Sequence, residues 1–353
     1  MATNTTTTLS GQYQNYFSKK LMTYAVQALV LDQFAEKAPL PAKSGHKAIS
    51  MFRWDAPSTS AIETLTEGTT TSGTRDITLT KISKSLLQRG QVIKLTDVLN
   101  ATDLFNSLSQ SVTINGQDAA LDLDSITRNT VVGSNVAGTA KENGDGSALD
   151  NSDTLTEQYA DGGTDYSTFD AVTDATSIMA ASSILEAVTK LKVNRAQPAR
   201  GGQYVAVTSP QVLSDIQQIS EWLNAAQYSN VQELYKGEVG SLYGAKFILS
   251  TNGWSSVYSS DDDDRFAYSV AGGGGRAAGK NIMATLFLGQ QAYGVPELTS
   301  QSPFGPRVII TDDADKTDPL NQLTTVVFKT FWTALRLNCN YYTIMRSKTD
   351  SLA

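Results

Sequence analysis

Residues 65–80 are Leu-Thr-Glu-Gly-Thr-Thr-Thr-Ser-Gly-Thr-Arg-Asp-Ile-Thr-Leu-Thr. Positions 69–74 contain no apolar residue, Ile77 and Leu79 then alternate with threonines, and a second strand-like segment follows at 92–95. The stretch therefore predicts a long two-stranded ribbon with little apolar surface to bury. Because isolated two-stranded ribbons are only marginally stable in water, this one needs another surface to lie on, and a second subunit is the simplest source of it.

The chain before this ribbon predicts an arm followed by a strand. Residues 1–10 are polar and rich in threonine, and apolar side chains then recur at helical spacing from 13 to 29. Residues 45–57 are expected to form a strand that Pro57 ends. An aromatic stripe so near the start of the chain packs either on its own core or on a neighbouring subunit, and the sequence leaves both open.

Two helices are predicted after the ribbon. Apolar spacing over 102–134 indicates a long helix with Thr102 or Asp103 as its N-cap. A second, amphipathic helix is expected at 174–192. Its inward face is expected to comprise Ile178, Ala181, Ile184, Leu185, Val188 and Leu191.

Strands and a short helix alternate in the rest of the chain, which gives an α+β fold class. Residues 204–207 are expected to form a buried strand, and Ser209 and Pro210 supply the N-cap and first position of a helix. Further strands are expected at 245–249, 266–270, 307–310 and 325–337.

Composition narrows the classes of function. Of 353 residues only 18% are charged, whereas 40 are threonine and 35 serine, and the net charge of −7 argues against a generic basic nucleic-acid coat. One cysteine and one histidine exclude an intramolecular disulfide framework and the usual zinc motifs. The sequence shows no signal peptide and no apolar run long enough to span a membrane, so we expect a protein that is cytosolic at synthesis.

A phosphate-loop pattern lies at 274–281, Gly-Gly-Arg-Ala-Ala-Gly-Lys-Asn. In a phosphate loop the residue after the lysine is a serine or threonine that ligates Mg²⁺, and here it is Asn281. The following residues, 282–288, contain enough large apolar side chains to form a strand. Nucleotide binding is therefore only a minor alternative.

The acidic segments and lone reactive residues do not form a catalytic or metal site in the sequence. Residues 138–170 carry eight carboxylates and one lysine but lack the spacing of a calcium loop, which indicates a polar surface insertion. The run Asp261, Asp262, Asp263 and Asp264 is expected to be a solvated loop tip. His46 has no Gly-x-Ser-x-Gly partner motif, and Cys339 is expected to be packed in an apolar strand.

Seven segments, in order along nearly the whole chain, resemble the major capsid proteins of tailed bacteriophages, specifically the family typified by the N4-like phages. They are Tyr16–Leu21, Gly45–Lys47 with Phe52 and Arg53, Leu65–Gly68, Thr208–Ile216, Gly237–Gly244, Leu288–Val295, and Asp318–Gln322 leading to Phe328 and Lys329.

This resemblance implies the Hong Kong ninety-seven capsid fold, an α+β architecture with an arm, an extended loop and two domains. The implied parts are an N-terminal arm at 1–60, an extended loop or β-hairpin at 61–97, a peripheral domain at 98–200 with a spine helix at 102–134 and a polar insertion at 138–170, an axial domain at 201–320, and a C-terminal strand at 321–353 that returns to the peripheral domain.

The resemblance also implies a coat protein that is not an enzyme and has no cofactor. Its copies are expected to assemble in the host cytoplasm into hexamers and pentamers. These would form the icosahedral shell of a virion around double-stranded DNA. Scaffold, portal and decoration proteins are the other implied partners, DNA is contacted non-specifically, and no membrane is involved. Candidate contacts between subunits are Tyr13, Tyr16, Phe17, Leu21, Glu67, Arg75, Ile77 and Leu79. Candidate axial-loop residues are Asp261, Asp262, Asp263, Asp264, Gly272, Gly273, Gly274 and Gly275.

Three other functions remain as alternatives. A non-viral nanocompartment shell of the same fold is the nearest to the capsid reading. The evidence for a phosphate-loop nucleotide-binding protein is the pattern at 274–280. The evidence for a secreted adhesin is the high threonine and serine content, but the sequence shows no signal peptide, which argues against secretion.

Overall fold

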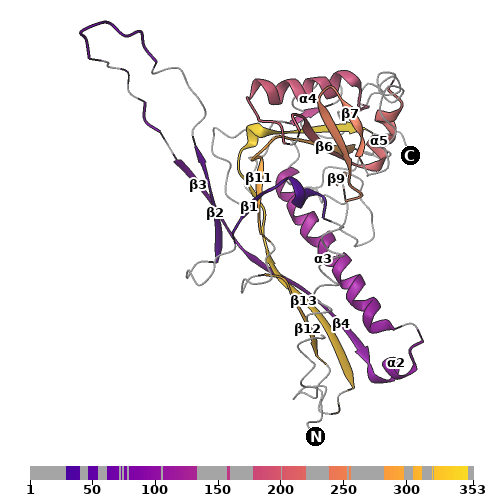
Figure 1. Ribbon diagram of the computed structural model, residues 1–353. Helices are drawn as coiled ribbons and strands as arrows, with labels where there is room; N and C mark the ends of the chain where they lie inside the picture. The colour runs from indigo at the N-terminus through magenta and orange to yellow at the C-terminus, as the bar shows by residue number, and fades with distance from the viewer. Residues whose placement is uncertain are drawn as a thin grey trace, which may run out of the picture.

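The computed structural model describes residues 29–39, 47–54, 62–70, 73, 75–77, 79–104, 106–132, 157–159, 178–199, 201–219, 238–252, 254–255, 282–297, 305–311, 320 and 322–348. In these ranges the strands form four sheets, and the molecule is elongated, with a long sheet and helix below, a second sheet with two helices above, and a ribbon that leaves the body at one side (Figure 1).

The long sheet contains three antiparallel strands in the order β12-β13-β4, with bounds Arg307–Thr311, Leu323–Trp332 and Leu87–Thr96. Alternate residues of β13 are buried, as expected of a strand with one covered face. Val326 and Phe328 pack there with Val112 of the long helix α3. No helix of the described residues covers the opposite face of this sheet (Figure 1).

The helix α3, Ser107–Val132, runs along the covered face of the long sheet (Figure 1). It is preceded by the short helix α2, Asp97–Thr102, whose N-cap Thr96 accepts a hydrogen bond from the backbone N–H of Leu99. The expected N-cap Asp103 accepts a hydrogen bond from the backbone N–H of Ser107. The predicted long helix is therefore confirmed, but it begins at Ser107, and α2 is a separate short helix before it.

The upper sheet has the strand order β5-β15-β10-β6-β8-β7, and β9 pairs with β10. The helices α4, Ala181–Val193, and α5, Pro210–Gln217, cover one face, where Ile184, Leu191 and Ile216 pack against Phe247 and Phe287. Strand bounds are Glu157–Tyr159, Tyr342–Lys348, Ile282–Leu288, Tyr204–Thr208, Ala245–Leu249, Glu238–Leu242 and Trp254–Ser255.

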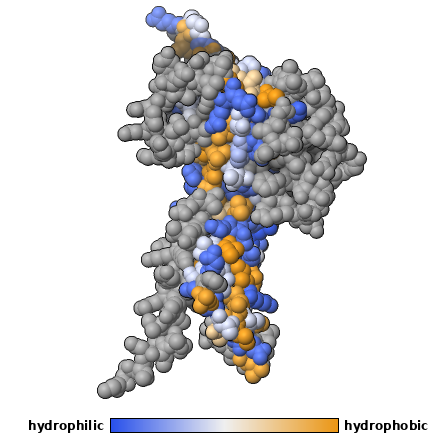
Figure 2. All heavy atoms as spheres, turned by 90° about the vertical axis from the view of Figure 1, so that its right-hand side faces the viewer, coloured by the Kyte–Doolittle hydropathy of each residue, from blue (hydrophilic) through white to orange (hydrophobic). Residues whose placement is uncertain are grey.

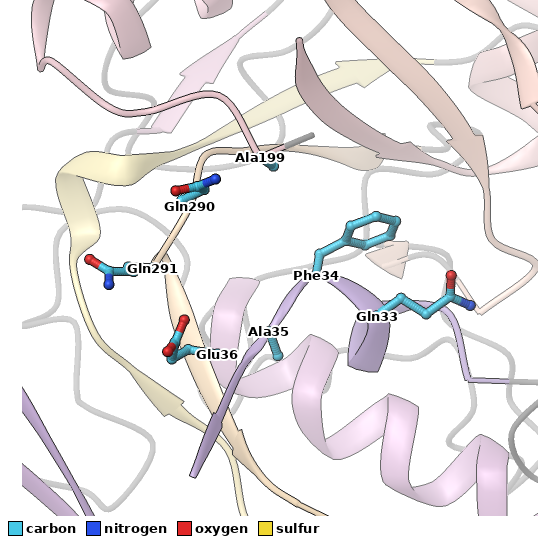
Figure 3. A pocket seen from close by; sticks show the side chains of 7 residues that line it. All are labelled: Gln33, Phe34, Ala35, Glu36, Ala199, Gln290 and Gln291. Carbon is cyan, nitrogen blue, oxygen red and sulfur yellow. The ribbon is translucent and has the colours of Figure 1, made fainter. Parts of the chain in front are cut away.

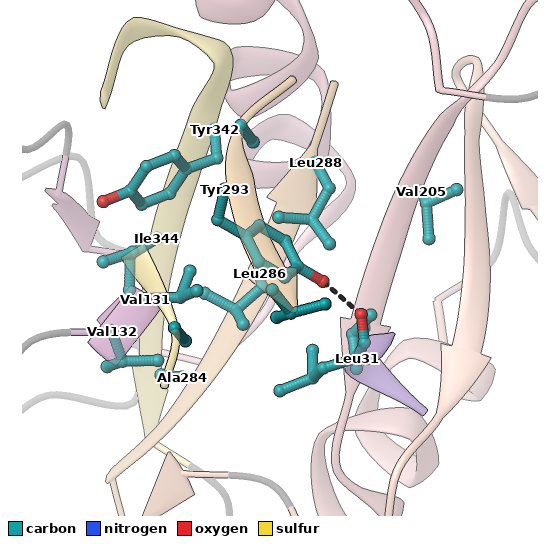
Figure 4. Close-up of a cluster of buried hydrophobic side chains, with 14 of the residues drawn as sticks. Leu31, Val131, Val132, Val205, Ala284, Leu286, Leu288, Tyr293, Tyr342 and Ile344 are labelled. Atoms are coloured by element: carbon teal, nitrogen blue, oxygen red, sulfur yellow. Dashed lines mark hydrogen bonds between the residues drawn. The ribbon is translucent and has the colours of Figure 1, made fainter. Parts of the chain in front are cut away.

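Both faces of this upper sheet are covered. Every residue of β6 is buried, and its side chains contribute alternately to two different apolar clusters. The second cluster lies between the sheet, the end of α3 and the 3-10 helix η1, Leu31–Phe34, and includes Leu286, Tyr293 and Trp332. This cluster joins the upper sheet to the long helix (Figure 4).

A small sheet connects the other parts. It has the order β1-β11-β14, with bounds Glu36–Ala38, Tyr293–Pro296 and Leu335–Arg336. The last sheet is the ribbon of β2, Ala48–Trp54, and β3, Leu79–Ser85. The second 3-10 helix, η5, Cys339–Tyr341, leads from the small sheet into β15.

Three sequence expectations differ from the structure. The segment at 92–95 is not a ribbon strand: it belongs to β4, which pairs with β13, and the partner of β3 is β2. The second helix begins at Ala181, and Ile178 forms a β-bridge with Lys348 instead. Leu185 points outward with 47% of its surface exposed. Strand partners and the covered side of a helix depend on distant residues, which periodicity does not identify.

The strands expected at 45–57, 204–207, 245–249 and 307–310 lie where the sequence places them, and 266–270 is outside the described residues. The single strand expected at 325–337 is instead divided between β13 of the long sheet and β14 of the small sheet. The sheets do not divide at the expected domain limits 200 and 320. Helix α4, from before residue 200, covers the upper sheet, and β12, from before residue 320, pairs in the long sheet. Pairing between segments far apart in sequence causes this difference, since each of the two large sheets collects strands from both halves of the chain.

Candidate assembly interface

The base of the ribbon is attached to the body through one of its two faces. In β2 and β3 the side chains alternate, and the row with Ile49, Met51 and Ile82 packs with Leu335 and Leu337 near the small sheet. Burial of this row holds the ribbon at a fixed position on the molecule.

Two cations and one glycine reinforce this attachment. Arg53 Nη1 donates to the carbonyl of Leu337 at 3.2 Å, and Lys84 Nζ donates to the carbonyl of Ala334 at 2.8 Å. A Cβ at Gly294 would overlap the sulfur of Met51, so the ribbon lies close against the backbone of β11. The base of the ribbon is therefore built into the subunit.

The outer face of the ribbon base is apolar and exposed. Phe52, Trp54 and Leu79 keep 56%, 66% and 44% of their surface accessible, and Trp54 lies directly opposite Leu79 in the register. Two adjacent aromatic side chains and a leucine on one exposed face are typical of a protein contact site. This outer face is one candidate contact surface.

The tip of the ribbon carries a second exposed surface. Ile62, Leu65 and Ile77 are each more than 70% exposed. The tip has local order: the backbone N–H of Thr69 donates to the carbonyl of Thr66, and Gly68 adopts a positive φ of 80° that favours glycine. The backbone N–H of Gly73 also donates to the carboxylate of Glu63 at 2.9 Å across the tip. The tip therefore presents apolar side chains on a shaped loop that lies away from the body (Figure 1).

A third group of exposed apolar side chains lies at the opposite end of the molecule. Val98, Leu99 and Leu104 are in and just after α2, and Leu323 begins β13 beside them. Figure 2 shows hydrophobic surface at this lower end. Exposed apolar groups thus occur at both ends of the elongated subunit.

A buried polar cluster lies inside the subunit where η1, α3 and the loop after β8 meet. Asp124 accepts hydrogen bonds from the backbone N–H of Leu31 at 3.0 Å and from Asn252 Nδ2 at 3.2 Å. Arg128 Nη1 donates to Asn252 Oδ1 at 2.8 Å. Tyr293 donates its hydroxyl to the carbonyl of Leu31 at 2.6 Å (Figure 4).

The electrostatics of this cluster follow from burial. Desolvation raises the pKa of the Asp124 carboxyl, although its hydrogen bonds and the charge of Arg128 act in the opposite direction. Desolvation lowers the pKa of Arg128, opposed by Asp124, and raises that of Tyr293 well above its ordinary value. Each polar group has partners within the fold, so the cluster joins three chain segments and offers no open position to a substrate.

One pocket of about 680 Å³ opens beside η1 and β1 (Figure 3). Of its described lining residues, only Glu36 is charged, and it has no second carboxylate, nucleophile or base beside it. The wall comprises Gln33, Phe34, Ala35, Glu36, Ala199, Gln290 and Gln291. This lining does not contain the groups of a general acid–base pair.

The structure also bears on the phosphate-loop pattern and on Cys339. Lys280 of the phosphate-loop pattern is outside the described residues, but the chain directly after it is β10, a strand in the middle of the upper sheet. A phosphate loop leads into a helix whose N-terminus holds the phosphates, and no such helix follows here. Cys339 is buried. In the part of the chain that the structure describes, no three carboxylate, histidine or cysteine side chains form a metal cluster, and no helix is long and apolar enough to cross a membrane.

Of the predicted contact residues, Glu67, Arg75, Ile77 and Leu79 are all exposed on the ribbon. Sequence reasoning missed Phe52 and Trp54, because the strand at 45–57 was not identified as half of the ribbon; their alternation with inward Met51 and Arg53 is the signal that marks them. Ile62 and Leu65 were also missed. Outside the described residues lie Tyr13, Tyr16, Phe17, Leu21, Asp261, Asp262, Asp263, Asp264, Gly272, Gly273, Gly274 and Gly275.

Solved structures similar to this one include capsids of bacteriophages. The capsid of Ralstonia phage GP4 matches with a TM-score of 0.61 at 12% identity, over 91% of this chain and 88% of that one. The capsid of the cyanophage P-SCSP1u matches at 0.58 and 15% identity, over 90% and 88%. The acidic stable capsid of Helicobacter pylori bacteriophage KHP30 matches at 0.56 and 11% identity, over 87% and 86%.

No protein-family model matches the sequence, and no curated protein matches it. At identities this low the shared feature is the fold. The chain therefore has the α+β fold of phage capsid proteins, of the Hong Kong ninety-seven type, over about nine-tenths of its length.

Proposed function

We propose that this chain is the major coat protein of a tailed phage and that its copies assemble into a closed shell. The observation that carries the proposal is the ribbon: its base is bonded to the subunit, whereas its outer face and its tip present exposed aromatic and aliphatic side chains with nothing of their own subunit to cover them. Such a projection enlarges a contact between copies without requiring a larger core.

Finer parts of the proposal rest on the sequence resemblance. The shell would consist of hexamers and pentamers around double-stranded DNA, and the chain would belong to the N4-like branch of phage coat proteins. Scaffold, portal and decoration proteins are the proposed partners besides further copies, and the virion capsid, assembled in the host cytoplasm, is the proposed location.

In the proposed arrangement the extended loop is the ribbon of β2, β3 and the tip between them, the chain before β2 is the arm, and the rest of the chain forms peripheral and axial parts. The long sheet with α3 corresponds to the peripheral part, and the sheet with α4 and α5 to the axial part. We assign no catalytic activity to either part, because the described pocket and polar cluster hold no reactive pair.

Electron microscopy and light scattering of the purified full chain, and of any particles formed on expression, test the proposal. Closed shells, or rings of five and six subunits, are expected. A protein that remains monomeric at every concentration and also hydrolyses ATP would contradict the coat-protein assignment.

Deletion of residues 69–74 provides a sharper test. The described residues of this segment, Thr69, Thr70 and Gly73, lie at the ribbon tip, so its loss is expected to leave the melting temperature of the unassembled subunit unchanged and to reduce the yield of particles. Circular dichroism of the subunit and sedimentation of the particles measure the two effects. A lower melting temperature with normal assembly would show that the tip is internal structure.

A further inference from the structure

The pocket of about 680 Å³ beside η1 and β1 presents polar groups that the subunit itself does not use. Figure 3 shows Glu36, Gln290 and Gln291 on one side of it and Gln33 and Phe34 on the other. Within the described residues, the carboxylate of Glu36 and the side-chain amides of Gln290 and Gln291 have no hydrogen-bond or ionic partner. The pocket therefore offers a carboxylate and two amides to an occupant.

The turn that carries two of these side chains is held in one conformation. The backbone N–H of Gly289 donates to the carbonyl of Tyr341 at 2.8 Å, and that of Gln290 donates to the carbonyl of Gln197 at 2.9 Å. A Cβ at Gly289 would lie 3.0 Å from both carbonyl oxygens, so glycine suits this close approach. Gln291 has a positive φ of 56°, which costs energy in a residue other than glycine and recurs at ligand-binding sites. The fold thus fixes the two glutamines at the pocket.

The lining suits an organic cation that has aromatic groups beside it. Glu36 is the only charged residue among the described lining residues, and the neighbouring cation Lys37 is already paired with Asp32. A carboxylate pairs with an ammonium group, the ring of Phe34 attracts the same charge, and glutamine amides both donate and accept hydrogen bonds. Nucleic acid does not suit the pocket, because Glu36 repels phosphate groups.

The N-terminal segment, residues 1–28, has the complementary composition and lies outside the described residues. It carries Lys19 and Lys20 and contains no aspartate or glutamate, although the net charge of the whole chain is −7. At the helical spacing expected here, Lys20 lies one turn after Tyr16 and one turn before Tyr24. A cation between two tyrosines matches a pocket with a carboxylate, an aromatic ring and amides.

This segment enters the described part of the chain beside the pocket. Leu29 is buried, and its carbonyl accepts a hydrogen bond at 2.9 Å from Nε2 of Gln33, which lines the pocket. Lys20 precedes Leu29 by nine positions. Nine residues span about 14 Å in a helix and about 30 Å in an extended chain, so Lys20 of the same chain is within reach. Tethering gives it an effective concentration on the order of millimolar, well above that of a second copy in dilute solution.

We propose that in the free subunit this pocket binds the N-terminal segment of the same chain. Lys20 pairs with Glu36 beside the ring of Phe34. The tyrosines on either side of Lys20 bond with the amides of Gln290 and Gln291. The contact holds the segment against its own subunit and keeps it from neighbouring copies, which goes beyond the proposed shell function because it concerns the subunit before assembly.

Limited proteolysis of the free subunit tests the contact. Trypsin cleavage after Lys19 is expected to be about tenfold faster in Glu36→Gln and in Lys20→Gln than in the wild type, because each variant removes one partner of the ion pair. The double variant is expected to be cleaved no faster than either single variant, since the two side chains act together. Equal rates in the wild type and both single variants, or effects that multiply in the double variant, would overturn the proposal.

Matched controls separate the contact from a change in net charge. Glu297→Gln removes an exposed carboxylate that is not among the lining residues and is expected to leave cleavage after Lys19 unchanged. Cleavage after Arg75, exposed on the ribbon, is the internal reference and is expected to stay constant in every variant. Faster cleavage at both sites in Glu36→Gln would indicate general loosening of the subunit and would contradict a local contact.

Cross-linking decides which chain supplies the segment. The free subunit with Lys20→Cys and Gln290→Cys is treated with a short bis-maleimide, and a link within one chain is expected, detected by mass spectrometry as two joined peptides. An equal mixture of the two single-cysteine variants is expected to give no covalent dimer, and native Cys339 is buried. Lys20→Cys with Lys192→Cys is the control pair. A dimer in the mixture, or no link in either sample, would overturn the proposal.

Assembly gives the one readout that rests on the proposed shell function. Glu36→Gln is expected to form particles at an about tenfold lower protein concentration than the wild type, because the fraction of subunits with an unbound segment rises by the same factor. A higher concentration requirement would mean that the pocket acts between copies and would overturn the proposal. Failure of the wild-type chain to form particles would contradict the shell function, whereas the proteolysis and cross-linking of the free subunit would still decide this inference.

Discussion

Asp124 connects α3 to η1 and to the loop after β8. Its two carboxylate oxygens accept hydrogen bonds from η1 and from the loop after β8, while it is itself part of α3. The neighbouring Trp332 donates its indole N–H to Thr127 at 3.3 Å, and Arg336 Nε donates to the carbonyl of Thr130 at 2.7 Å. Polar contacts of this kind fix the relative position of the helix and the sheets, because leaving any of them unpaired in the interior is costly.

The raised pKa of Asp124 predicts a pH dependence. Because folding raises this pKa above the unfolded value of 3.8, the folded state favours the protonated acid. The stability contributed by Asp124 is thus greatest below the unfolded pKa and falls as the pH rises through the folded pKa. Urea unfolding of the free subunit from pH 3 to pH 7, compared with Asp124→Asn, is expected to show the wild type losing stability relative to the variant as the pH rises. The opposite slope would contradict the assigned desolvation.

Gly294 predicts a packing effect. Gly294→Ala places a methyl group against the Met51 side chain, and we expect it to lower the free energy of unfolding by about 1–3 kcal/mol through overpacking. Adding Met51→Ala makes room and is expected to recover part of this loss, which urea denaturation of the single and double variants measures. Equal stability of Gly294→Ala and the wild type would show that the ribbon base does not rest on β11.

At the scale of elements, the ribbon combines an attached face and a free face in the same two strands. Strand alternation produces this difference: Ile49 and Met51 point to the body, and Phe52 and Trp54 straddle the inward-facing Arg53 on the other side. The long sheet repeats the arrangement with one face on α3 and one face uncovered. Two elements of the subunit therefore each keep one side for contacts outside it.

Two positions on opposite faces of β2 predict opposite outcomes. Trp54→Ala is expected to change the stability of the free subunit by less than about 0.5 kcal/mol, since the side chain is exposed, and to impair assembly. Ile49→Ala removes a buried side chain from the same strand and is expected to cost about 2–5 kcal/mol of unfolding free energy. Denaturation of the free subunits and sedimentation of the particles separate the effects. Similar losses of stability in both variants would mean that the outer face is covered within the subunit.

For the whole molecule, contacts between copies depend on how the exposed apolar groups are distributed, and not on one site. Apolar side chains are exposed at the ribbon, on the face of the long sheet opposite α3 and at the end near α2. Several modest contacts at separated places suit a shell subunit, because each can dissociate and re-form during assembly.

The position of β10 predicts how the phosphate-loop pattern behaves. Lys280→Ala is expected to leave particle yield unchanged, and the wild-type chain is expected not to retain labelled ATP on a filter. The reason is that β10, which begins at Ile282, pairs with β15 from its first residue, so the chain after Lys280 offers no helix N-terminus to phosphates. Saturable ATP retention that Lys280→Ala abolishes would contradict this expectation.

Local features of the fold could be predicted from the sequence where short-range chemistry decides them. The long helix, the start of α5 at Pro210 and the strand β12 follow from periodicity and from residues that favour helix ends. The exposure of Glu67, Arg75, Ile77 and Leu79 follows from a segment with too few apolar residues to form a core. The partner of β3 could not be predicted in this way, since β2 and β4 both have strand composition and only the tertiary structure selects between them.

The sequence by itself determined the α+β class, most helices and strands, and the presence of a ribbon that lacks a core of its own. The tertiary structure decided which strands pair, that each large sheet takes strands from both halves of the chain, and that Phe52 and Trp54 lie on the exposed side of the ribbon. The physical reason is the sequence distance over which the interactions act. Helix periodicity and capping depend on residues a few positions apart, whereas the pairing register of strands and the face that is buried depend on contacts between segments that can be hundreds of residues apart.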